Sequence, residues 1–252
     1  MYLKKLATPE FRITIGDVII QNGIQVECFS SGEEKADWCK VVLDDSLEGR
    51  IAFQDMERAV VELGYDDDFD TIINGYIRKA SEDYWKEVII KDDMMKLERC
   101  RISATFMQCT AQDIIRYILT SAGISQYQLS DKDFGQLEKV TIPASTGISA
   151  IKAVNNAFEI SVPYYVRDGI FYWGIEKEQK EIYVLDEGNS IINLEKLGNL
   201  WEAETVGIPW IHHSEVIEVS HTKISGTFGI EKVIIKGDET GRVRQYIYFK
   251  GA

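Results

Sequence analysis

Apolar and polar residues alternate with a period of two through most of the first hundred residues. This alternation is typical of β-strands that bury one face. It is clearest in two triplets of same-parity residues, Phe11, Ile13, Ile15 and Ile24, Val26, Cys28. Further strands are expected over 38–43 and 85–90, and residues 49–62 fit either a strand or a short helix. The alternation therefore predicts six or seven short antiparallel strands within residues 1–97, which is the pattern of a small barrel or sandwich.

Two turn signals divide this first segment. Asn22-Gly23 predicts a tight hairpin, because this dipeptide tolerates the left-handed backbone angles of a two-residue loop. The acidic run at 66–70 predicts a solvated loop. It resembles a calcium-binding loop only in its charge, since the EF-hand pattern requires glycine at its sixth position, where Thr71 stands here.

The pattern changes from period two to helical spacing near residue 100. Thr110 and Asp113 have the spacing of a capping box, in which two side chains bind the free amides at a helix start. The apolar positions that follow share one helical face: Ile114, Ile115, Ile118, Leu119 and Ala122. Gly123 is suited to end this helix. A second helix is expected from Ser145 or Thr146, with a stripe at Ile148, Ile151, Val154 and Phe158. A hairpin around Asp168-Gly169 should follow it.

Strand-like runs return from about residue 176 and continue to the last residues. They cover 182–185, 191–194, 201–206, 216–219, 228–235 and 243–249, the last one after a turn at Glu239-Thr240-Gly241. The sequence therefore predicts an α+β fold in which two small antiparallel β-barrel domains, at 1–97 and 176–252, flank an inserted helix-helix-hairpin domain at 98–175.

Charge and composition narrow the classes of partner. Apolar residues make up 45% of the chain, which is enough to build buried cores. The formal net charge is −13, and no cluster of lysine and arginine stands out. Since nucleic-acid affinity comes mainly from cations that neutralise phosphates, we expect no specific nucleic-acid binding. No apolar run is long enough to span a membrane, and the N-terminus lacks the apolar core of a signal peptide.

The residues that most often carry chemistry do not form a known pattern. The four cysteines contain no CxxC pair, so they are expected to be reduced and to pack as small hydrophobes: Cys28, Cys39, Cys100 and Cys109. His212 and His213 would point to opposite faces of a strand, and His221 is distant, so surface or interface histidines are expected instead of a metal site. No nucleophile elbow, zinc-protease motif or phosphate-binding loop occurs, and no carboxylate pair stands out for hydrolysis of glycans.

Aromatic residues cluster at 164–173 and again around Trp201 and Trp210. Exposed rings of this kind can stack on sugars or bases. Here they are not interleaved with lysine and arginine, so packing in the core and between strands is the favoured interpretation.

Three longer segments carry a resemblance to a known family. They are Thr110–Leu119 (TAQDIIRYIL), Thr141–Val154 (TIPASTGISAIKAV) and Tyr164–Gly174 (YYVRDGIFYWG). In this order, between two β-rich segments, they resemble the baseplate hub proteins of contractile phage tails and of tail-like bacteriocin particles, the late-control-protein-D group. Ile208-Pro209 with Ile211, Val216 and Val219 looks like the start of that family's second barrel. These motifs specify packing and turns, not a reaction.

The resemblance implies a structural role in an assembly. Three copies would form a homotrimeric ring, each with two tail-tube-like barrels, between the hexameric tail tube and a trimeric spike protein. Other baseplate proteins and a tape measure protein would be further partners. The resemblance implies no enzymatic activity, no catalytic residue, no cofactor and no metal. It implies assembly in the bacterial cytoplasm, as part of a virion or tail-like particle. Since the chain ends at Ala252, soon after its last strand, we expect the spike to be a separate chain.

Two other functions stay open. One is a protein that binds or hydrolyses carbohydrate through the aromatic cluster and a carboxylate pair. The other is a different tail component, such as a tube initiator or a distal tail protein. For an assembly role, the expected interfaces are exposed strands and loops of both β-rich segments together with the loop 64–76. Acidic residues lining a lumen would repel DNA phosphates and let cargo pass.

Overall fold

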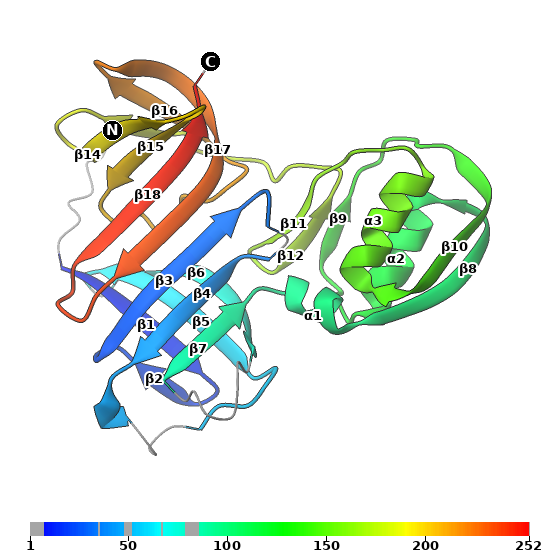
Figure 1. The fold of residues 1–252 in the computed structure, drawn as a ribbon, viewed down its shortest axis with the longest axis horizontal. Coiled ribbons are helices and arrows are strands. Elements are labelled where there is room, and N and C mark those ends of the chain that lie inside the picture. Colours follow the sequence, from blue (N-terminus) through cyan, green and yellow to red (C-terminus); the bar gives the residue numbers. More distant parts are fainter. Residues whose placement is uncertain (1–7, 35, 48–51, 67, 79–85, 252) are drawn as a thin grey trace. The chain divides into compact units, whose positions relative to one another are not determined.

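The computed structural model describes residues 8–34, 36–47, 52–66, 68–78 and 86–251. Expectations that fall on residues 1–7, 48–51 and 79–85 and on Asp67 lie outside these described residues. The chain divides into two compact units. Unit 1 combines Met1–Lys91 with Glu178–Ala252, and unit 2 is the segment between them, Asp92–Lys177. Figure 1 shows the elements of both units.

Unit 1 consists almost entirely of β-strands, as the alternating pattern predicts. In most strands every second side chain is buried, for example Ile24, Val26 and Cys28. The strands are β1 (Pro9–Ile15), β2 (Val18–Ile20), β3 (Ile24–Ser31), β4 (Trp38–Leu43), β5 (Arg58–Tyr65), β6 (Asp68–Arg78), β7 (Glu87–Lys91), β13 (Tyr183–Asp186), β14 (Ile191–Leu197), β15 (Leu200–Thr205), β16 (Val216–His221), β17 (Ile224–Gly237) and β18 (Val243–Lys250). A short 3-10 helix, Asp45–Leu47, follows β4.

These strands join in one sheet that connects the two ends of the chain. The order along its main path is β14-β15-β18-β17-β3-β4-β7-β6-β5-β1-β2, with β16 on β17 and β13 on β16. The long strand β17 makes the connection, because it pairs with β16 and β18 of the C-terminal segment and also with β3 of the N-terminal segment. Within the described residues the path is open and no closed barrel forms. The two closed barrels expected from the sequence are therefore not found.

A buried loop lies between β15 and β16 in the core of unit 1. Tyr65 Oη donates a hydrogen bond to the carbonyl oxygen of Gly207 at 2.5 Å. Gln245 Oε1 accepts the backbone N–H of Ile208 at 2.7 Å. Because Tyr65 comes from β5 and Gln245 from β18, this loop ties together strands from both ends of the chain.

Unit 2 contains the three α-helices of the described chain. They are α1 (Met94–Arg99), α2 (Ala111–Ser121) and α3 (Gly147–Ala157), with strands β8 (Arg101–Thr110), β9 (Tyr127–Leu129), β10 (Gln136–Thr146), β11 (Tyr164–Arg167) and β12 (Ile170–Trp173). Figure 1 shows α2 and α3 side by side against β8 and β10, which pair as a two-stranded antiparallel sheet. The sequence did not predict this sheet. A second sheet has the order β11-β12-β9, in which β9 runs parallel to β12.

Local signals predicted the helices α2 and α3 and the β11–β12 hairpin of unit 2 correctly, but not the short helix α1. The capping box forms: Thr110 accepts from the N–H of Asp113, and Asp113 accepts from the N–H of Thr110. Gly123 follows the helix with φ of +72°, and the N–H of Ile124 bonds back to Leu119. The second helix begins at Gly147, next to the expected start. Asp168 and Gly169 both have positive φ, which gives the tight turn predicted between β11 and β12.

Two predictions about loops were wrong. Asn22-Gly23 does not connect a hairpin, since β2 pairs with β1 and β3 pairs with β4 and β17. The tight hairpin lies one turn earlier, at Gly16-Asp17, where Ile15 pairs with Val18. Residues 64–76 are not a loop, because β5 extends to Tyr65 and β6 begins at Asp68.

The prediction of four reduced cysteines was wrong for two of them. Cys28 in β3 lies directly opposite Cys39 in β4, and the two form a disulfide. Cys100 and Cys109 are free. The sequence separation of 11 residues gave no indication of this pair, since only the strand register places the two side chains together.

No helix in the described part of the chain has the length and apolar content to cross a membrane.

Candidate assembly surface

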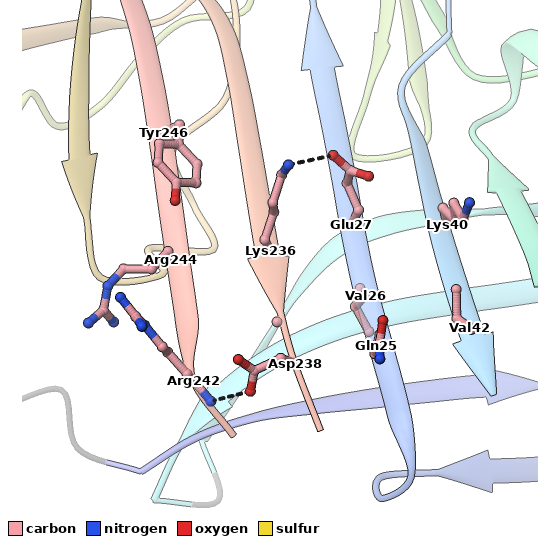
Figure 2. Close-up of a pocket in the computed structure, with 11 residues that line it drawn as sticks. Gln25, Val26, Glu27, Lys40, Val42, Lys236, Asp238, Arg242, Arg244 and Tyr246 are labelled. Carbon is pink, nitrogen blue, oxygen red and sulfur yellow. Dashed lines mark hydrogen bonds and ion pairs between the residues drawn. The ribbon is translucent and has the colours of Figure 1, made fainter. Parts of the chain in front are cut away.

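An open groove of about 580 Å³ crosses the outward face of unit 1. It lies over four neighbouring strands, two from each β-rich segment of the chain, as Figure 2 shows. Strand alternation explains its lining: in β3 the side chains between the buried ones point outward. The principal side chains are Gln25 and Glu27 from β3, Lys40 from β4, Lys236 from β17, and Arg244 and Tyr246 from β18.

Ion pairs between neighbouring strands neutralise most of the charge around this groove. Lys236 Nζ lies 3.1 Å from Glu27 Oε1, its direct partner in the strand register. Two further pairs flank it, Lys40 with Glu87 at 2.6 Å and Arg244 with Glu204 at 3.3 Å. Each is partly exposed, so each stabilises the fold by ~1 kcal/mol at most. The face is therefore polar and nearly balanced in charge.

The turn between β17 and β18 closes one end of the groove. Asp238 accepts hydrogen bonds from the Thr240 side chain at 2.5 Å and from the Arg242 backbone N–H at 3.2 Å. These bonds, the first above all, together with the charge of Arg242 lower the pKa of Asp238. Asp238 thus stays ionised and holds the turn, and the exposed Arg242 lies at the groove end.

Aromatic rings lie on the same outward face of the sheet as the groove. Phe29 in β3 stacks on Trp38 in β4, with ring centroids 5.2 Å apart and planes 10° from parallel. On the neighbouring strands Lys232 Nζ lies 3.8 Å from the centroid of the Tyr248 ring. Aromatic residues and arginine are enriched at protein–protein contacts, whereas lysine and glutamate belong mainly to their polar rim. We therefore take the groove and its aromatic border as a candidate assembly surface.

Two of the three histidines, which were expected at a surface or an interface, lie in the interior instead. His212 and His213 are buried in the loop before β16. Because this segment is a loop and not a strand, the alternation expected for the two side chains does not apply. His213 Nδ1 lies 2.7 Å from Ser30 Oγ and 3.4 Å from Asp37 Oδ1. Both contacts use the same ring nitrogen, so the three residues lack the geometry of a Ser-His-Asp triad. They connect the loop to β3.

The aromatic cluster at 164–173 is packed in the interior, as the favoured interpretation predicted. Tyr164, Tyr165, Phe171, Tyr172 and Trp173 are all buried. Trp173 Nε1 donates to Asn155 Oδ1 at 3.1 Å, and Tyr165 stacks on Tyr172 across the hairpin. Burial raises the pKa of Tyr164 to about 12. These rings present no exposed platform for a sugar or a base.

The described residues of the acidic run lie at the turn after β5 and at the start of β6. Tyr65 pairs with Asp68, and Asp66, which has a positive φ, begins the turn between them. Asp66 and Asp68 are exposed, whereas Asp70 is partly buried in β6. In the part of the chain that the structure describes, no three His, Cys, Asp or Glu side chains gather where a metal could bind.

Sequence reasoning identified the outward positions of single strands but not the groove. The alternation in β3 and β4 indicates which residues face outward. The pairing of Glu27 with Lys236, more than 200 residues along the chain, has no local signal.

Comparison with known proteins rests on structure alone. No protein-family model matches the chain, and no curated protein sequence matches it. A tail protein of prophage MuSo2 from Shewanella oneidensis has a TM-score of 0.76 at 13% identity, over 96% of this chain and 98% of that one. A tail protein from Neisseria meningitidis has a TM-score of 0.71 at 12% identity, over 97% of each chain.

A third similar structure comes from Escherichia coli. It is described as a component of the type VI secretion system with structural similarity to bacteriophage T4 tail proteins. Its TM-score is 0.69 at 11% identity, over 95% of this chain and 76% of that one. At such identities a likeness concerns the fold, and we conclude that this chain has the fold of phage tail proteins.

Proposed function

We propose that this protein is a structural subunit of a phage tail or tail-like particle, and that it acts there as the baseplate hub. The main support is the fold shared with the tail protein of prophage MuSo2, which extends over 96% of this chain. Nearly every residue thus belongs to an architecture found in tail proteins. The resemblance of Thr110–Leu119 and Tyr164–Gly174 to hub proteins supports the more specific role.

The sheet of unit 1 suits a wall shared among subunits. Because β17 pairs with strands of both β-rich segments, these segments form one continuous body and not two independent ones. A rigid sheet can hold fixed contact surfaces against neighbours. The groove face supplies one such surface, with aromatic rings and balanced charges.

In the proposed particle three copies form a ring. One side of the ring meets the hexameric tail tube, and the other holds a trimeric spike. The β-rich segments 1–97 and 176–252, although joined in one sheet, would each supply a tube-like part with 98–175 inserted between them, so that three copies match a sixfold tube. Other baseplate proteins and a tape measure protein complete the list of partners, and assembly takes place in the bacterial cytoplasm. The net charge of −13 fits a lumen that repels DNA.

The number of copies in an assembled particle tests this proposal. The chain is produced together with the tube and spike proteins of the same particle, and the complex is imaged by electron cryomicroscopy. Three copies between tube and spike are expected. Six copies would overturn the hub role in favour of another tail component, such as a tube initiator or distal tail protein. A chain that stays monomeric with both partners present would overturn the assembly role itself.

A further inference from the structure

The disulfide Cys28–Cys39 lies buried in the sheet of unit 1. The two cysteines face each other across β3 and β4, and they are 4% and 1% exposed. Assembly in the bacterial cytoplasm, as proposed above, places the chain in a reducing compartment, where structural disulfides are rare. A particle that leaves the cell meets an oxidising medium instead. The two thiols of this pair therefore pass from one condition to the other.

The strand register keeps the two sulfur atoms together whether or not they are bonded. Cys28–Cys39 is one step of an antiparallel ladder that runs from Ile24–Leu43 to Phe29–Trp38. β17 pairs with the other edge of β3, and β7 with the other edge of β4, so both strands lie inside the sheet. Oxidation of the pair therefore needs no change in strand pairing.

The bond closes the end of the β3–β4 hairpin, which anchors the buried loop before β16. Ser30 and Asp37 both lie within the 11-residue separation of the two cysteines. His213 Nδ1 of the loop lies 2.7 Å from Ser30 Oγ and 3.4 Å from Asp37 Oδ1. The stacked rings of Phe29 and Trp38 are the next step of the same ladder, on the outward face. A covalent bond here thus restrains the anchor of the loop and the aromatic border of the candidate assembly surface.

We propose that Cys28 and Cys39 form a redox-sensitive tie, which is a dithiol while the chain folds in the cytoplasm and a disulfide in the released particle. The oxidant is a low-molecular-weight disulfide such as oxidised glutathione. One cysteine thiolate attacks a sulfur of the reagent and expels a first glutathione thiolate, and the other cysteine thiolate then breaks the mixed disulfide and expels the second. Two electrons pass to the reagent, and the two cysteine protons end on the released thiols. The inference rests on the cytoplasmic assembly of the proposed function.

Burial makes this exchange slow. Neither β3 nor β4 is an edge strand, so a reagent reaches the sulfur atoms only when the strands part transiently. Cys100 is free and partly exposed, and it should react with iodoacetamide in the folded protein well before Cys28 and Cys39 in their reduced form. The tie therefore responds to a lasting change of compartment and not to a brief exposure.

Trapping of thiols measures the state of the pair in each compartment. Cells that produce the full chain are quenched in acid, and free thiols are alkylated with N-ethylmaleimide in urea. Trypsin cleaves after Lys35, so the disulfide links two peptides that mass spectrometry identifies. Alkylated Cys28 and Cys39 are expected from quenched cells, and linked peptides after incubation with oxidised glutathione in low urea, which speeds opening of the strands. A complete disulfide in quenched cells, or a dithiol that persists under oxidised glutathione, would overturn the inference.

Melting of the two forms measures the strength of the tie. A disulfide across a separation of 11 residues should raise the melting temperature of unit 1 by about 5–10 °C over the reduced form. A chain with both Cys28→Ala and Cys39→Ala should melt at the same temperature in oxidising and reducing buffer. The Cys100→Ser variant should keep the full difference. Equal midpoints for the two forms of the wild type would show that the bond restrains nothing.

Substitution of Ser30 tests the link between the tie and the loop. Ser30→Ala removes the hydroxyl that contacts His213, and it should lower the melting temperature more in the oxidised than in the reduced form. In the reduced form the end of the hairpin is less restrained, so less of this contact remains to be lost. Thr110→Ala, in unit 2, is the control and should have the same effect in both forms. Equal effects of Ser30→Ala would mean that the tie and the loop are independent.

These outcomes are separate from the number of copies in the particle. Six copies between tube and spike would overturn the hub role and leave the redox-sensitive tie standing. A permanent disulfide in quenched cells would overturn the tie and leave the hub role standing.

Discussion

Single buried polar residues hold the loop between β15 and β16 in the core of unit 1. Tyr65 binds the carbonyl of Gly207, Gln245 binds the N–H of Ile208, and His213 binds Ser30. Backbone N–H and C=O groups that are buried without hydrogen bonds destabilise the folded state. A loop can therefore pass through a core only if side chains form hydrogen bonds with its backbone. The loop therefore depends on a few residues from distant strands.

Removal of the Tyr65 hydroxyl should destabilise unit 1. In Tyr65→Phe the carbonyl of Gly207 loses its hydrogen bond while it stays buried, which we expect to lower the free energy of unfolding by about 1–3 kcal/mol. Urea unfolding followed by tryptophan fluorescence measures this change. Tyr117→Phe is the control, since Tyr117 is 46% exposed and should tolerate the loss of its hydroxyl. Equal stability of the Tyr65→Phe variant and the wild type would contradict this account of the loop.

The same tyrosine predicts a response to alkaline pH. Burial raises the pKa of Tyr65 from 10.0 to about 12. Because the folded-state pKa is the higher one, its contribution to stability is complete below pH 10 and is lost as pH rises towards 12. The free energy of unfolding of the wild type should therefore fall more steeply over this range than that of Tyr65→Phe. Parallel slopes in the two proteins would show that Tyr65 ionises equally in the folded and unfolded states.

Gly207 should not accept a side chain. A Cβ atom there would lie 2.6 Å from Val243 Cγ1 and 2.7 Å from Leu63 Cδ2, both in the core. Gly207→Ala is expected to cost about 1–3 kcal/mol of stability, the usual effect of overpacking. Gly229→Ala in β17 is the control, because nothing lies within 4 Å of the added atom. Thermal unfolding of the two variants should differ clearly, and equal midpoints would argue against close packing of the loop.

At the scale of elements, the sequence predicted best where the signal is local. The capping box of α2 and the Asp168-Gly169 turn each involve residues close together in the chain, and both formed as predicted. Asn22-Gly23 shows the limit of such signals. A turn-forming dipeptide permits a hairpin but does not require one. β3 pairs with β4 and β17, so β2 and β3, which flank this turn, do not pair with each other.

The cap of α2 gives a prediction at this scale. Thr110→Ala removes the side chain that binds the N–H of Asp113, and we expect a loss of about 1 kcal/mol in the stability of unit 2. Thr120→Ala, in the last turn of the same helix, should cause no such loss, since alanine favours helix. Circular dichroism melts of both variants provide the measurement. A stable Thr110→Ala variant would mean that tertiary packing alone fixes the helix start.

At the scale of the whole molecule, the chain leaves unit 1 after Lys91 and returns to it at Glu178. Between these points unit 2 has its own sheets and three helices within the described residues, and its helices pack mainly on its own strands. Such a segment meets the description of a domain that can fold by itself.

We therefore expect residues 92–177, produced alone, to fold. Their circular dichroism spectrum should show the helices α2 and α3, and their thermal unfolding should be cooperative. The hydrogen bond between Trp173 and Asn155 offers an internal probe, because tryptophan fluorescence should change in the same transition. A non-cooperative melt would show that unit 2 depends on unit 1 for its stability.

The sequence by itself determined most of the strands of unit 1, where α2 and α3 start, and where the β11–β12 turn lies. These features depend on neighbouring residues, whose preferences act before any distant contact forms. Only the tertiary structure decided that Cys28 meets Cys39, that His213 is buried beside Ser30, and that β3 and β17 together form the groove. Each of these depends on strand register and on pairing across long stretches of chain, which is settled by the burial of the whole core and not by any local pattern.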